Sequence, residues 1–91
     1  MGIIESDVVD RIRRNDNSLT RVEIRHWDSD AVEILHALKN NLVVKKVFMH
    51  IIWYGEGNLV EVNQKVFVKL SEVTKCNKSV ESLTLYLYFW N

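Results

Sequence analysis

The segment Leu19-Thr20-Arg21-Val22-Glu23-Ile24 contains a spacing of apolar residues that returns twice in this 91-residue chain. The pattern Leu19-x-x-Val22-x-Ile24 is followed by Val44-x-x-Val47-x-Met49 and by Val80-x-x-Leu83-x-Leu85. Apolar residues that alternate with polar ones indicate a β-strand with one buried side. We therefore expect three strands built on one pattern, and such an internal repeat outweighs other signals of the fold.

The segment before the second copy of the pattern predicts a helix. Its apolar residues stand at i, i+3, i+4 and i+7 and form one stripe: Ala31, Ile34, Leu35 and Leu38. Asp30 precedes Glu33 by three residues, which is close to a capping box, so we expect Asp30 to cap this helix. The pair Asn40-Asn41 is expected to provide a left-handed exit.

Two further helices are expected, each before a polar stretch that contains Asn. The first covers roughly residues 7–14 with Ser6 as its cap, and the third covers roughly residues 63–75. A hairpin that turns at Asn63-Gln64 competes with the third helix because its neighbours are β-branched, although the turn lacks Asn-Gly chemistry. Residues 55–62 contain two of the chain's glycines and are expected to form a loop.

The order helix, strand, helix, strand, helix, strand predicts a single α/β domain over residues 1–91. This alternation is typical of a parallel sheet against which helices pack. A repeated helix–strand unit indicates a solenoid, in which each unit buries its apolar edge against the next. We expect units at approximately residues 5–26, 30–54 and 63–91, with residues 55–62 as a loop insertion.

The junction Ala37-Leu38-Lys39-Asn40-Asn41, followed by Val44-Lys45-Lys46-Val47, resembles that of leucine-rich repeats. The most similar subclass is that of ribonuclease inhibitor and tropomodulin, and residues 13–20 match the same junction one repeat earlier. The resemblance implies a short right-handed solenoid of about three units, with a parallel sheet on its concave face. The family usually places Asn or Cys three positions after the last strand Leu. Here those positions hold Trp27, Ile52 and Tyr88, so the turns need another means of stabilisation.

Alternation along the strands assigns the remaining side chains to one surface of the sheet. We expect this surface to contain Arg21, Glu23, Arg25, Lys46, Phe48, His50, Ser82, Thr84 and Tyr86. Arg, Tyr and Phe are enriched in protein interfaces, and the resemblance implies binding on the concave face. The alternative is a plain solvent-facing surface, on which Phe48 and Tyr86 serve cross-strand packing.

Aromatic residues follow each strand pattern, and we expect them to gather at one rim of the sheet: Trp27, Trp53, Tyr54, Tyr88, Phe89 and Trp90. They either wedge the loops or form an apolar docking patch. Residues 83–90 are strongly β-prone and carry no charge. An edge strand of this kind invites pairing, so self-association through it, or a place within a longer repeat array, is expected unless a loop shields the edge.

Composition excludes several function classes. Twelve basic residues balance twelve acidic ones, which argues against nucleic-acid binding. The single Cys76 excludes an internal disulfide and a thiolate zinc site, fits a reducing compartment and is expected to be half-buried. His26, His36 and His50 should not converge, so we expect no metal site. Without a nucleophile–base pair or a phosphate loop, we expect neither an enzyme nor a cofactor.

These observations predict a non-enzymatic protein-interaction module that binds a protein partner through its concave sheet. The alternative is a structural or assembly unit that uses the C-terminal edge strand, either as a homo-oligomer or within a longer repeat protein. The tropomodulin-like junction adds actin regulation as a further option, without any actin-specific residue. We expect no membrane span, because no apolar run is long enough, and a cytoplasmic location.

Overall fold

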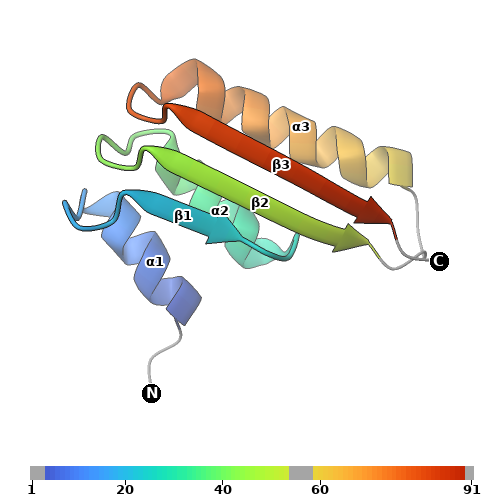
Figure 1. Ribbon diagram of the computed structural model, residues 1–91, viewed down its shortest axis with the longest axis horizontal. Helices are drawn as coiled ribbons and strands as arrows, with labels where there is room; N and C mark the ends of the chain where they lie inside the picture. The colour runs from blue at the N-terminus through green and yellow to red at the C-terminus, as the bar shows by residue number, and fades with distance from the viewer. Residues whose placement is uncertain (1–3, 54–58, 90–91) are drawn as a thin grey trace.

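The computed structural model describes residues 4–53 and 59–89, in which helices and strands alternate. The elements are α1 (Ile4–Arg13), β1 (Arg21–Ile24), α2 (Ser29–Leu38), β2 (Lys46–Trp53), α3 (Leu59–Cys76) and β3 (Ser82–Phe89). The three strands form one parallel sheet in the order β1-β2-β3. The helices lie together behind the sheet in Figure 1, which leaves its other face open. The prediction of an α/β fold with a parallel sheet is therefore confirmed.

The register of the sheet aligns the three copies of the sequence pattern. Val22 of β1 lies opposite Val47 of β2, which in turn lies opposite Leu83 of β3. Two positions later, Met49 lies between its partners on the two outer strands. Side chains two residues apart point to the same face of a strand, so the repeated apolar residues all face the helices.

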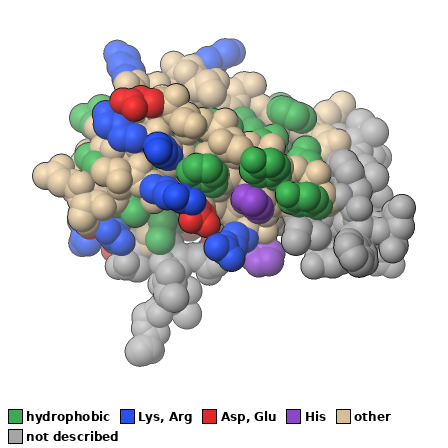
Figure 2. All heavy atoms as spheres, in the orientation of Figure 1, with side chains coloured by type: hydrophobic (Ala, Val, Ile, Leu, Met, Phe, Trp, Pro, Cys, Tyr) green, Lys and Arg blue, Asp and Glu red, His purple; other side chains and the backbone are tan. Residues whose placement is uncertain are grey.

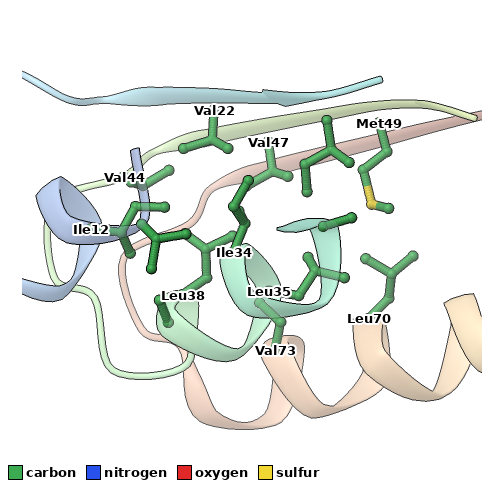
Figure 3. Close-up of a cluster of buried hydrophobic side chains, with 14 of the residues drawn as sticks. Ile12, Val22, Ile34, Leu35, Leu38, Val44, Val47, Met49, Leu70 and Val73 are labelled. Atoms are coloured by element: carbon green, nitrogen blue, oxygen red, sulfur yellow. The ribbon is translucent and has the colours of Figure 1, made fainter. Parts of the chain in front are cut away.

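The core fills the space between the sheet and the helices, as Figure 3 shows. Its fully buried side chains come from all three helices and from the strands, among them Ile12, Leu35, Val47, Met49 and Val73. Full burial of an aliphatic side chain of this size stabilises the fold by about 1.5–3 kcal/mol. One continuous apolar layer therefore holds the helices against the sheet.

The N-cap of helix α2 lies two residues before the predicted cap Asp30. The N-cap residue is Asp28, whose Oδ1 accepts a hydrogen bond of 3.0 Å from the backbone N–H of Ala31. Asp30 lies in the first turn, where its negative charge interacts favourably with the helix dipole. The prediction of a left-handed helix exit at Asn40-Asn41 is wrong. In the described ranges, Asn15 is the one non-glycine residue with positive φ.

The other two helices are longer than expected. Helix α1 begins at Ile4, so Ser6 lies inside it and is not its cap. Helix α3 begins at Leu59, so a hairpin at Asn63-Gln64 is wrong and part of the expected loop is helical. Burial of the stripe Val66, Leu70 and Val73 outweighs the β-propensity of the branched residues. The rest of that loop, residues 55–58, lies outside the described residues.

An asparagine organises the second and third of the junctions between a helix and the following strand. Asn41 is buried, and its side-chain oxygen accepts the backbone N–H groups of Val43 and Val44 at 2.9 and 2.7 Å. Its amide nitrogen donates to the carbonyl of Ile12 at 2.9 Å. A buried amide with all these partners shapes the turn and ties it to the preceding helix.

Asn77 repeats the arrangement one unit later. Its side-chain oxygen accepts the N–H groups of Ser79 and Val80, both at 2.7 Å. Its amide nitrogen donates to the carbonyls of Leu38 and Asn41 at 2.6 and 3.0 Å. The two asparagines thus form a ladder across the units, at the turns that lead from a helix into the following strand.

The first unit has Asp16 at the equivalent position. Its Oδ1 accepts from the backbone N–H and the hydroxyl of Ser18, at 2.9 and 2.7 Å. Arg11 donates to Oδ2 at 2.8 Å. A carboxylate has no N–H to donate, so the ladder of side-chain hydrogen bonds ends at Asp16. The carboxylate of Asp16 binds Arg11 instead.

Candidate functional site: the open face of the sheet

The side chains that alternate with the core residues lie on the face of the sheet away from the helices. We call this surface the open face and define it by Arg21, Glu23, Arg25, Lys46, Phe48, His50, Ser82, Thr84, Tyr86 and Tyr88. Figure 2 views the molecule from this side and shows hydrophobic, basic and His side chains gathered on it. All the predicted site residues therefore share one surface.

The parallel register sets these side chains side by side. Arg21, Lys46 and Ser82 form one row across the strands, and Glu23, Phe48 and Thr84 form the next. The following row holds His50 and Tyr86, because β1 ends before it. Rigid strands therefore place residues from three distant parts of the sequence within contact distance of one another.

An aromatic group occupies one end of the open face. The rings of His50 and Tyr86 lie with their centroids 4.9 Å apart at an interplanar angle of 42°. Tyr88 stacks on Tyr86 at 6.3 Å and faces His50 at 6.4 Å. Tyr86 and Tyr88 remain 47% and 49% exposed. Half-exposed tyrosines whose positions are fixed by neighbouring rings are suited to contact a partner at little entropic cost.

Charged side chains occupy the other end. The guanidinium of Arg21 lies over the ring of Phe48, 4.2 Å from its centroid, in a cation–π contact. Arg21 and Arg25 both form ion pairs with Glu23, at 3.1 and 3.2 Å. Among the described residues, Lys46 has no ion-pair partner. The open face therefore combines an aromatic surface with a net positive flank.

A shallow hollow lies between these two ends. Its lining comprises Glu23, Arg25, His26 and His50. His26 and His50 both border this hollow, since His26 lies two residues after the end of β1. His36 lies exposed on α2. Within the residues that the structure describes, no group of His, Cys, Asp and Glu side chains could hold a metal ion.

The structure revises two further expectations. Cys76 is exposed, not half-buried, because it ends α3 outside the buried stripe. The aromatic rim is not one cluster: Trp27 is half-buried against the core, whereas Tyr88 lies within β3 on the open face. The side chains of the remaining rim residues, Trp53, Tyr54, Phe89 and Trp90, lie outside the part that the structure describes.

Sequence reasoning missed Tyr88 as a member of the open face and His26 as a residue at its border. The alternation that selected Tyr86 also selects Tyr88, once β3 is known to continue to Phe89. No pattern in the sequence identifies His26, since its position depends on how the chain leaves β1.

Within the described ranges, no helix has both the length and the apolar character that a membrane span requires.

No family model matches the chain, and neither a curated protein nor a solved structure is significantly similar to it. The surface chemistry of the fold is therefore the basis for any assignment of function.

Proposed function

We propose that the chain is a non-enzymatic interaction module that binds a protein partner on the open face. The observation that carries this proposal is the row of fixed aromatic side chains beside a basic flank. Tyr86 and Tyr88 are about half exposed although the sheet has a helical layer on its other side to bury apolar residues. Aromatic residues and Arg are the side chains that contribute most to binding energy in protein interfaces.

The charges on the open face favour a particular kind of partner surface. Arg21 and Arg25 both pair with Glu23. Together with Lys46, this flank therefore has three basic side chains and one acidic side chain. We propose a partner that presents an apolar or aromatic patch with carboxylates beside it. Carboxylates would pair with Lys46 and Arg25, while the apolar patch would cover the tyrosines.

We further propose that the chain is a short right-handed solenoid of the leucine-rich-repeat type, with the open face as its concave surface. The aligned register, the packing of α2 against both α1 and α3, and the asparagine ladder support this view. The free thiol of Cys76 is consistent with the cytoplasm as its compartment.

Affinity capture with the immobilised full chain tests the binding proposal. Phe48→Ala and Arg25→Glu should each lower recovery of the specific partner about 30-fold or more, as expected for residues central to an interface. Leu42→Ala is the matched control, because Leu42 is 66% exposed and lies in the turn before β2, away from the open face. Circular dichroism checks that each variant is folded. Recovery of the same proteins by both variants and the parent would overturn the proposal.

A further inference from the structure

The two edges of the sheet differ. Strand β1 is four residues long and contains charged side chains, which are common devices against edge pairing. Strand β3 is eight residues long, has the sequence Ser-Leu-Thr-Leu-Tyr-Leu-Tyr-Phe and contains neither charge nor proline. No described strand pairs with its outer edge. Within residues 4–53 and 59–89, the β3 edge therefore lacks the protection that the charged side chains give the β1 edge.

Burial of the repeated apolar residues shows the same asymmetry. At equivalent positions, Val22 and Ile24 of β1 are each 3% exposed, and Val47 and Met49 of β2 are 1% and 0% exposed. Their counterparts on β3, Leu83 and Leu85, are only partly buried, and so is Leu87, which lies opposite the 2% exposed Ile51 of β2. The third unit exposes apolar positions that the first two units cover.

In the first two units, backbone carbonyl groups accept hydrogen bonds from the unit that follows, and the equivalent carbonyl groups at the β3–α3 edge have no such donors among the described residues. The carbonyl of Leu38 accepts from the N–H of Asn41 at 3.2 Å and from the Asn77 side chain at 2.6 Å. The equivalent carbonyl of Val73 accepts only the N–H of Asn77, at 2.7 Å, among the described residues. The carbonyl of Asn77 corresponds to that of Asn41 and receives no donor from the described part of the chain.

The carbonyl group before each strand shows the same difference between the units. The carbonyl of Thr20 accepts the N–H groups of Lys45 and Lys46, at 2.8 and 3.1 Å. One unit later, the carbonyl of Lys45 accepts those of Glu81 and Ser82, at the same two distances. The carbonyl of Glu81 is next in this series, and no N–H of the described residues reaches it.

These acceptors border a hollow between α3 and β3. Its lining comprises Val73, Thr74, Asn77, Val80, Glu81, Ser82 and Leu83. Phe67 lies on the same face of α3 as Thr74, seven residues away, and is 53% exposed. The edge therefore combines partly exposed apolar residues on both layers with the carbonyls of Asn77 and Glu81, which accept no hydrogen bond from the described residues.

We propose that the β3–α3 edge docks a further helix–strand unit that carries its own asparagine before the strand. That asparagine would donate to the carbonyls of Val73 and Asn77, and the strand would pair with β3. The first unit of a second copy does not fit this role, because the side chain of Asp16 has no N–H to donate and is bound to Arg11. The occupant is thus a helix–strand unit of the same architecture in a partner repeat protein, and the proposal is independent of binding on the open face.

A tandem variant, in which the full chain is followed by a second copy of residues 54–91, tests the proposal. The appended unit should fold against β3, with one cooperative thermal transition and a Tm at least about 5 °C above that of the parent. Amide exchange should show protection in the appended strand. In the appended copy, Asn77→Ala should remove at least half of the Tm gain, whereas Lys75→Ala, an exposed helix position, should leave it unchanged.

Three results would overturn the proposal. The first is an appended unit whose amides exchange as in an unfolded chain. The second is a tandem variant that folds equally well with and without the appended asparagine, which would refute the ladder contact. The third is a symmetric dimer of the unmodified chain that Leu85→Lys dissociates, since a second copy would then be the occupant. Sedimentation of the parent over a hundredfold range of concentration distinguishes this last case.

Discussion

The side-chain amide of Asn77 donates a hydrogen bond of 3.0 Å to the backbone carbonyl of Asn41, the residue at the equivalent position of the preceding unit. The two residues lie 36 positions apart in the sequence, and both shape the turn in which they lie. This contact couples the conformation of one turn to that of the next. The same residue type therefore gives each unit its local turn and holds the units in register.

Replacement of Asn41 by Ala should destabilise the protein by about 2–4 kcal/mol. Three hydrogen bonds of a buried side chain are lost, and the carbonyl and N–H groups that they satisfied are left without these partners. Asn40→Ala is the control, because this neighbouring Asn is exposed. Urea denaturation monitored by circular dichroism measures both. Equal effects of the two substitutions would show that the ladder does not stabilise the fold.

Asp16 should make the stability depend on acidic pH. Hydrogen bonds from Ser18, and then from Arg11, hold the pKa of the Asp16 carboxyl well below its usual range. In the unfolded chain this pKa is about 3.9, so below about pH 4 the unfolded state takes up a proton that the folded state does not. The contribution of Asp16 is therefore present above about pH 4 and is lost as the pH falls further.

Asp16→Asn tests this dependence. The difference in Tm between the parent and Asp16→Asn should be largest near pH 6 and should shrink toward pH 2. Asp10→Asn serves as the control, because the exposed Asp10 lacks these donors. A Tm difference that stays constant from pH 6 to pH 2 would contradict the assigned role of the carboxylate.

Two residues at the same register position should respond differently to truncation. Met49 is 0% exposed, so Met49→Ala should cost roughly 2–5 kcal/mol through lost burial and a cavity. Its neighbour Leu85 on β3 is only partly buried, so Leu85→Ala should cost roughly 1–2 kcal/mol. Chemical denaturation provides both values. If Leu85→Ala were as costly as Met49→Ala, the β3 edge would be covered in solution.

The contact between Arg21 and Phe48 should be measurable by a double-mutant cycle. A guanidinium 4.2 Å from the ring centroid, at a solvent-exposed site, should give a coupling free energy of about 0.5–1 kcal/mol. The cycle compares Arg21→Ala, Phe48→Ala and the double variant by denaturation. A parallel cycle with Arg25→Ala should show no coupling to Phe48, since Arg25 contacts Glu23 instead. Coupling of similar size in both cycles would indicate a general charge effect.

Local patterns in the sequence determined much of the fold. The three copies of the apolar spacing predict the strands and align with the register of the sheet, because burial on one face requires a period of two. The apolar stripe from Ala31 to Leu38 predicts α2. Burial of one face of a helix requires apolar residues three and four positions apart. Alternation also placed the predicted open-face residues, including Phe48 and Tyr86, on one surface.

Only the tertiary structure decided features that depend on neighbouring units. The sequence contains Asn41 and Asn77 in polar stretches, but their roles follow from carbonyls that belong to other helices, such as those of Ile12 and Leu38. The long third helix likewise depends on the core that buries Val66. Periodicity specifies which side of an element is apolar. Which distant groups meet across the units is set by packing in three dimensions, and that packing places no other described strand at the outer edge of β3.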